Sequence, residues 1–172
     1  MDARRLKGFA KLLARKNIEW HELDAGDGSA GYIRIFQKST GEKTPTIYRM
    51  LINQHHSPVL QFATLAHELA HLFLGNLGVD HTLKISHRPG LSHADRELEA
   101  ESVAYLICAR NGIHSASERY LADFVTPETN LDRLDLYAIM RTAGQIEALL
   151  GLTAHTQFEK PQVTTLQAMP LS

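Results

Sequence analysis

The sequence has a single cysteine, Cys108, in 172 residues, which excludes an internal disulfide and indicates a reducing compartment. It also lacks an apolar run near the roughly 20 residues that span a bilayer, and its first residues have no signal-peptide pattern. The formal net charge of −1 gives no overall field that would attract nucleic acid or an anionic membrane. We therefore expect a cytoplasmic protein without membrane association, with Cys108 in its core.

The residues that are present are typical of one globular domain. Hydrophobic residues make up 44% and charged residues 22%, and 172 residues suffice for one sizeable core. We expect this domain at 1–152, with its core at 46–150. A flexible tail is expected at 153–172, where the chain is polar, aperiodic and interrupted by Pro161 and Pro170. The ten histidines are the one compositional hint of metal or proton chemistry.

Hydrophobic periodicity predicts an α+β domain that is mostly helical. Helices are expected at 3–17, 58–74, 95–110, 117–124 and 131–150, and a β-hairpin at 31–37 and 46–53. The second strand of this hairpin does not alternate cleanly between apolar and polar residues, which predicts cover on both of its faces. Residues 79–93 show no clear period, and loops of this length are usually functional or mobile.

One motif in the second of these helices carries the chemistry: His67-Glu68-Leu69-Ala70-His71. Two histidines four residues apart leave the same face of a helix, and Zn²⁺ accepts neutral imidazole nitrogens. Glu68 lies one step further round, where a carboxylate can take a proton from an attacking water and pass it to a leaving amine. The motif predicts zinc-dependent amide hydrolysis, with His67 and His71 as metal ligands and Glu68 as general base.

A catalytic zinc site usually has a third protein ligand, and an acidic run in the next helix is the obvious source. Glu97 and Glu101 are four residues apart and share the apolar side of that helix, whereas Glu99 points nearly opposite. We expect Glu97 to be the third ligand and Glu101 to accept a hydrogen bond from the free N–H of a ligand histidine. For Glu99 we expect only the favourable effect of a carboxylate near a helix N-terminus.

Amide hydrolysis also needs a group that stabilises the developing oxyanion. The sequence offers several candidates and singles out none of them: His81, His87, His93, Tyr48 and Tyr120. The neighbouring histidines His55 and His56 form another potential metal pair. Because Ser57-Pro58 follows them, we favour an exposed turn at this pair.

Three stretches carry a family resemblance: Leu51-Ile52-Asn53, Phe62-Ala63-Thr64-Leu65-Ala66-His67-Glu68-Leu69-Ala70-His71, and Glu97-Leu98-Glu99-Ala100. Together they resemble the ImmA/IrrE family of gluzincin-like zinc metallopeptidases. The resemblance implies a zincin-like domain with a small sheet beside the motif helix and a glutamate as third zinc ligand. It also implies cleavage of a protein partner, often a DNA-binding repressor. We expect the strand at 46–53 to form the rim of the cleft and to bind an extended substrate by strand addition.

Residues 97–113 are also similar to the C-terminal metallopeptidase-like domain of ArdC antirestriction proteins, which leaves two alternatives to a peptidase. One is a non-proteolytic zinc-binding module that acts on DNA or on a DNA-processing enzyme, and the basic residues between Arg4 and Lys16 slightly favour it. The other is a zinc sensor that folds around its metal and unfolds on chelation. The sequence does not indicate an oligomeric state.

Overall fold

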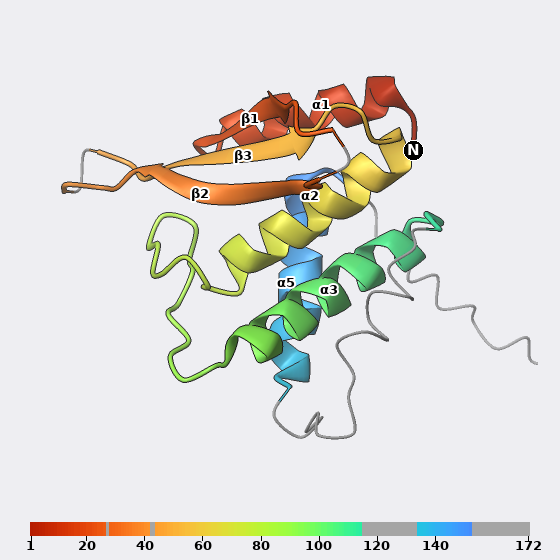
Figure 1. Cartoon of the computed structure of the whole chain (residues 1–172). Coiled ribbons are helices and arrows are strands. Elements are labelled where there is room, and N and C mark those ends of the chain that lie inside the picture. Colours follow the sequence, from red (N-terminus) through yellow and green to blue (C-terminus); the bar gives the residue numbers. More distant parts are fainter. Residues whose placement is uncertain (27, 42–43, 115–133, 153–172) are drawn as a thin grey trace, which may run out of the picture.

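In the residues that the computed structural model describes, the elements are a three-stranded sheet and four helices (Figure 1). The α+β prediction is confirmed. The structure describes four stretches of the chain: 1–26, 28–41, 44–114 and 134–152. Their elements are α1 (Ala3–Ala14), β1 (Ile18–Leu23), β2 (Gly31–Gln37), β3 (Ile47–Asn53), α2 (Pro58–Phe73), α3 (His93–Arg110) and α5 (Leu136–Leu149). The predicted helix at 117–124 and the predicted tail lie outside these stretches. Within them, every helix is too short or too polar to cross a bilayer.

The sheet has the strand order β1–β3–β2, with β1 parallel and β2 antiparallel to the central strand. The predicted hairpin of β2 and β3 is confirmed, whereas β1 is an additional strand. The first predicted helix reaches residue 17 because apolar residues recur at helical spacing as far as Ile18. In the structure α1 ends at Ala14, and Asn17 turns the chain into β1 with a left-handed φ of 58°.

Two predictions about β3 are wrong. Tyr48, Met50 and Ile52 are buried while the residues between them are half-buried, so one face of the strand is well covered rather than both. Apolar residues on the outer face hide this alternation in the sequence. Both edges of β3 pair with neighbouring strands, so β3 has no free edge for a substrate. In the part of the chain that the structure describes, the unpaired edges belong to β1 and β2.

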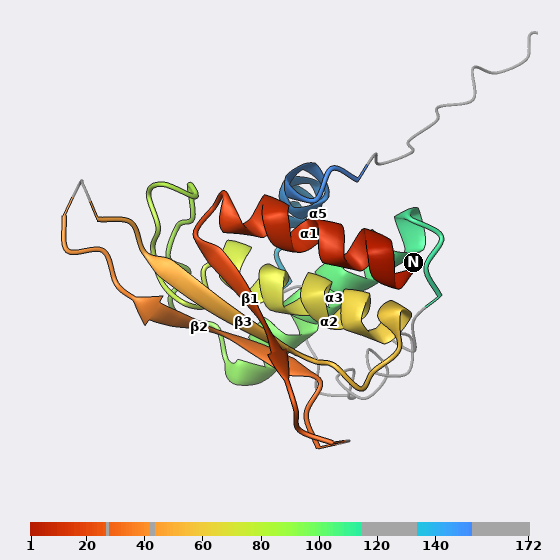
Figure 2. The same ribbon diagram turned by 90° about the horizontal axis from the view of Figure 1, so that it is seen from above.

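The motif helix α2 lies at the centre of the molecule, between the sheet and α3 (Figure 1). Ser57 caps its first turn by accepting a hydrogen bond from the Leu60 amide, and Pro58 fits the first helical position. The helix α1 runs beside it (Figure 2), and the rings of Phe9 and Phe62 meet with centroids 5.8 Å apart. Because α2 packs against the sheet and against α1, α3 and α5, these contacts together fix its orientation.

Gly31 allows β2 to pass close to α2. A Cβ at this position would lie 2.5 Å from the Leu51 carbonyl oxygen and 2.8 Å from Cγ2 of Thr64. Both distances are shorter than a side chain can accept without displacing its neighbours. The absence of a side chain therefore sets how closely this edge strand approaches the motif helix.

The two remaining helices start at well-defined caps. Ser92 and Asp95 form a capping box, so α3 begins two residues earlier than predicted. Asp135 caps α5, which begins at Leu136 rather than at 131 as predicted. Residues 131–133 lie outside the described stretches. The prediction that Cys108 lies in the core is confirmed, because only 1% of its surface is exposed.

Candidate metal centre

His67 and His71 leave α2 one turn apart and face α3. Their Nε2 atoms are 3.0 Å apart, and the two rings meet edge to face with centroids 4.7 Å apart. Only 20% and 14% of the two side chains are exposed. Two imidazoles that present the same nitrogen to one point, partly shielded from water, are arranged for a shared cation.

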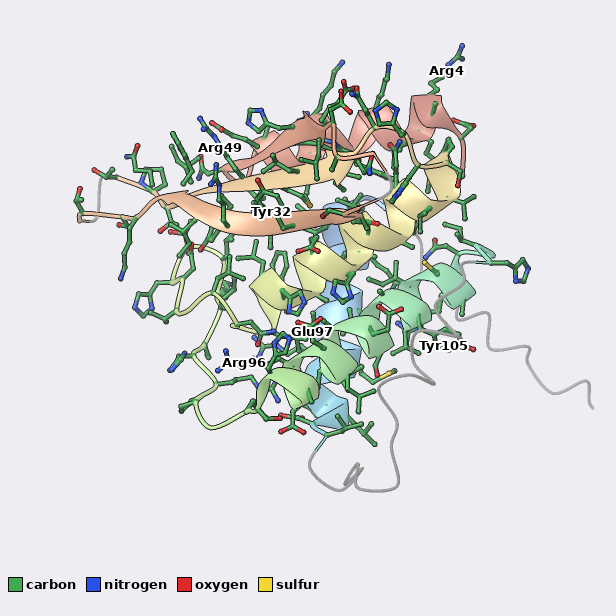
Figure 3. All side chains as sticks on the ribbon, viewed as in Figure 1. Arg4, Tyr32, Arg49, Arg96, Glu97 and Tyr105 are labelled. Atoms are coloured by element: carbon green, nitrogen blue, oxygen red, sulfur yellow. The ribbon has the colours of Figure 1, made fainter. Side chains whose placement is uncertain are left out.

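Glu97 reaches the same point from α3 (Figure 3). Its two carboxylate oxygens lie 3.5 Å from Nε2 of His67 and 3.4 Å from Nε2 of His71. One potential ligand atom from each of the three residues falls within 4.8 Å of the others, so this group could hold a metal ion. The structure thus brings together the three residues that the sequence analysis selected as ligands.

Glu101 lies one turn further along α3 and accepts a hydrogen bond from Nδ1 of His67 at 2.9 Å. This is the contact expected of it from the sequence. Burial lowers the pKa of His67, but hydrogen bonds to Glu101 and Glu97 outweigh that effect and raise the pKa to about 9. The same histidines hold the pKa of Glu97 well below its usual range. Without a metal, a proton on His67 therefore balances part of the acidic charge.

Glu68 reaches from α2 to the sheet, and its carboxylate stays within the electrostatic influence of His67 and His71. Its Oε2 accepts a hydrogen bond from the backbone N–H of Ile33 in β2, at 3.0 Å. Burial raises the pKa of the Glu68 carboxyl, and the nearby histidines oppose this effect. A carboxylate between an edge strand and a pair of histidines is placed to exchange a proton with a molecule bound between them.

The expectation for Glu99 is wrong. Its side chain is fully buried, and the guanidinium of Arg88 donates two hydrogen bonds to it at 2.6 and 2.9 Å. The backbone amide of Asp135 donates a third, at 3.2 Å. Glu99 therefore connects the loop after α2, the middle of α3 and the start of α5. The carboxylate points away from the histidines, as its helix position predicts. It is nevertheless buried between the loop that carries Arg88 and the start of α5 rather than exposed to water.

Of the other candidates within the described residues, Tyr48 bonds elsewhere, while His93 lies next to Glu97. Tyr48 donates a buried hydrogen bond to Asp80 at 2.8 Å, which holds the loop after α2 against the sheet. His93 lies one turn before Glu97, with its Nδ1 3.7 Å from a Glu97 oxygen, and 88% of its side chain is exposed. His81 and His87 are exposed, and Tyr120 is outside the described residues. His55 and His56 lie in a turn as expected; His55 is exposed and pairs with Asp24, whereas His56 is half-buried rather than exposed.

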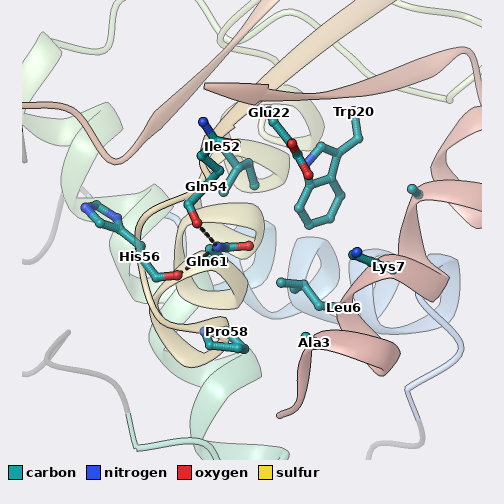
Figure 4. A pocket seen from close by; sticks show the side chains of 11 residues that line it. Ala3, Leu6, Lys7, Trp20, Glu22, Ile52, Gln54, His56, Pro58 and Gln61 are labelled. Carbon is teal, nitrogen blue, oxygen red and sulfur yellow. Dashed lines mark hydrogen bonds between the residues drawn. The ribbon is translucent and has the colours of Figure 1, made fainter. Parts of the chain in front are cut away.

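A pocket of about 760 Å³ opens between α1, β1 and the start of α2 (Figure 4). Trp20, Leu6, Lys7 and Glu22 line it, together with the turn that contains His56. It lies at the N-terminal end of α2, whereas His67 and His71 occupy the C-terminal half of that helix. The pocket is therefore separate from the candidate metal centre.

Two helices that present two histidines and a glutamate, with a further carboxylate beside an edge strand, have the arrangement of a metallopeptidase domain. A family model described as the IrrE N-terminal-like domain, Peptidase_M78, matches residues 15–123, and the chain belongs to this metallopeptidase family. The predicted ImmA/IrrE membership is confirmed, while the likeness to ArdC proteins stays a prediction. No curated protein and no solved structure matches the chain.

Proposed function

We propose that the protein is a zinc-dependent metalloendopeptidase that hydrolyses a peptide bond in a protein partner. The observation that carries this proposal is the convergence of His67, His71 and Glu97, with the Glu68 carboxylate next to them and hydrogen-bonded to an edge strand. Membership of a metallopeptidase family supports the same reaction class.

The residues fit a zinc ion. Two imidazole nitrogens and one carboxylate oxygen are the ligands of many catalytic zinc sites, in which the fourth position stays open. Nδ1 of His67 already donates to a carboxylate, an arrangement that orients a ligand histidine and increases its basicity. When bound, such an ion would polarise the scissile carbonyl and promote ionisation of the attacking water.

In this proposal Glu68 moves the proton. As general base it accepts a proton from the attacking water, and as general acid it returns that proton to the leaving amine. Burial raises the pKa of this carboxyl, which brings its proton affinity closer to that of a base working near neutral pH. The hydrogen bond from Ile33 holds the carboxylate beside β2, where an extended chain would lie.

The edge of β2 supports a peptide as substrate. Alternate residues of an antiparallel strand turn their backbone groups away from the partner strand. The Ile33 amide bonds to Glu68 rather than to β3, so Gly31, Ile33 and Ile35 direct their N–H and C=O groups to the unpaired edge. An extended peptide could pair with the groups of this edge other than the Ile33 N–H, which bonds to Glu68, and present a bond to the histidines. We propose that the partner is cytoplasmic and is a DNA-binding repressor or another regulator.

A combined metal and cleavage assay tests the proposal. The probes are Zn²⁺ alone and a peptide library prepared from a proteome digest, with new termini identified by mass spectrometry. We expect Glu68→Gln to bind one zinc ion with nearly the parent affinity and to cleave nothing. Glu97→Ala should lose most of its zinc affinity, while Glu22→Gln, an exposed control, should behave like the parent. If Glu68→Gln cleaves as fast as the parent, this carboxylate is not the base.

A second function, DNA binding, is favoured by one observation. Arg4, Arg5 and Lys11 are exposed on α1, and Arg4 points away from the molecule (Figure 3). If the parent binds zinc, cleaves no peptide and binds DNA in a strongly salt-dependent manner that neutralising these three residues abolishes, the DNA-associated module replaces the peptidase.

A further inference from the structure

A histidine offers Nε2 to a metal only in the tautomer that has its hydrogen on Nδ1. When that Nδ1–H is shielded from water, it needs an acceptor, because an unsatisfied buried donor costs about 1–3 kcal/mol. For His67 the acceptor is the Glu101 carboxylate. The corresponding contact of His71 is with the side-chain amide of Asn76, whose nitrogen lies 2.8 Å from Nδ1.

The backbone holds Asn76 beside His71. The chain leaves α2 through Gly75, which has a left-handed φ of 82°. The backbone amide of Asn76 then donates to the carbonyl of His71 at 3.0 Å. A side chain at Gly75 would collide with the Ser86 carbonyl, so this turn is packed against the following loop. The Asn76 side chain is half-buried. Its place next to His71 is therefore set by the fold.

The amide can serve both tautomers of His71. With Nδ2 facing the ring, it donates to a bare Nδ1, and the His71 hydrogen is then on Nε2, which lies 3.4 Å from a carboxylate oxygen of Glu97. When Nε2 of His71 binds an ion instead, the hydrogen of the ring is on Nδ1. A half-turn of the amide about its Cβ–Cγ bond then presents Oδ1 as the acceptor.

We propose that Asn76 is a positioning residue of the metal centre: its side-chain oxygen accepts the Nδ1–H of His71 and so fixes the ring and tautomer that bind the ion. The inference rests on the proposed zinc site, because it concerns how His71 is prepared as a ligand. It assigns a role to a residue outside both the motif and the acidic helix. The two ligand histidines then have different acceptors, a carboxylate for His67 and an amide for His71.

The acceptor role predicts opposite results for two substitutions of similar size. Asn76→Leu removes the acceptor and should weaken zinc binding about 10- to 100-fold, the usual effect of losing such a contact. Asn76→Asp keeps an oxygen at the same place and should bind zinc at least as tightly as the parent. Zinc dissociation constants are measured for the full chain at one pH by competition with a chelator of known affinity.

Asn111→Leu is the matched control. Asn111 lies at the end of α3, where its amide donates to the Ile107 carbonyl, so its loss should affect stability without changing zinc affinity. Urea unfolding of the metal-free variants separates stability from binding. Imidazole ¹⁵N spectra of the zinc-loaded protein supply a second measurement, in which Nδ1 of His71 should carry a hydrogen in the parent and in Asn76→Asp. If Asn76→Leu does not fold, Asn76→Ala takes its place.

The possible results separate this inference from the proposed function. Equal zinc affinity in Asn76→Leu and the parent overturns the inference, and so does an Asn76→Asp variant as weak as Asn76→Leu. A parent that binds zinc and cleaves nothing refutes the peptidase. The zinc affinities of the Asn76 variants then still decide the role of Asn76. A parent that binds no zinc overturns both.

Discussion

The buried ion pair of Arg88 and Glu99 allows a quantitative prediction. Glu99 is fully buried and Arg88 has 21% of its side chain exposed, so neither charge is well hydrated. Replacing Arg88 with methionine leaves a buried carboxylate with one remaining hydrogen bond, from the Asp135 amide. Removing one partner of a buried pair usually costs about 3–5 kcal/mol. We expect Arg88→Met to lower the free energy of unfolding by about this amount, out of a total of about 5–15 kcal/mol for a domain.

Urea unfolding at constant pH and zinc concentration measures this effect. With a urea dependence of about 2 kcal/mol per molar, the loss would shift the midpoint by roughly 2 M. The double variant Arg88→Met/Glu99→Met should recover most of the stability, because it also removes the buried Glu99 carboxylate that has lost its ion-pair partner.

Arg49→Met provides the matched control for this experiment. It breaks a pair with Glu19 whose side chains are 30% and 41% exposed, so it should destabilise the protein much less than Arg88→Met does. If Arg88→Met costs no more than Arg49→Met, the buried pair does not hold the loop to α3, and the reasoning fails.

Two further predictions concern the sheet and the histidines. Gly31→Ala should cost about 1–3 kcal/mol of stability and reduce kcat/KM, because its Cβ would collide with the Leu51 carbonyl of β3 and with Thr64 of α2. Gly8→Ala in α1, with open space around its Cβ among the described residues, should instead gain up to about 1 kcal/mol. The metal-free protein should lose stability as pH rises. The pKa of His67 is about 9 in the folded protein, above its ordinary value of 6.5. The contribution of His67 to the free energy of unfolding is therefore fully present below pH 6.5 and disappears as pH passes 9. The shift corresponds to about 3 kcal/mol, and urea unfolding in chelator should show this slope in the parent and a flatter one in His67→Gln.

Local sequence rules predicted much of the candidate site because its spacing is helical. His67, His71, Glu97 and Glu101 lie on two helices, and a four-residue interval places each pair on one face wherever the helices pack. What those rules could not supply was the way in which the two helices meet. The structure brings the Glu97 oxygens within 3.5 Å of the histidines.

The errors in the sequence analysis share a physical cause: they concern partners that are distant in sequence. Glu99 reads as a surface residue until Arg88, eleven positions earlier, is folded onto it. The centre of a sheet cannot be distinguished from its edge without knowing that β1 exists, so β3 was assigned the role that the unpaired edge of β2 can fill. Asn76 gives no signal in the sequence, because its contact with His71 depends on the turn at Gly75.

The hydrogen bond between Ile33 and Glu68 has a consequence for observing this protein in solution. An amide on the unpaired edge of a strand would ordinarily exchange its hydrogen with the solvent quickly, but the Ile33 amide is held by a half-buried carboxylate 35 residues away. Its exchange rate therefore reports the state of Glu68 from outside the candidate metal centre, since a movement of the carboxylate towards the histidines releases the amide. A single backbone position in β2 is thus an internal probe of whether the Glu68 carboxylate is held at the strand or released from it.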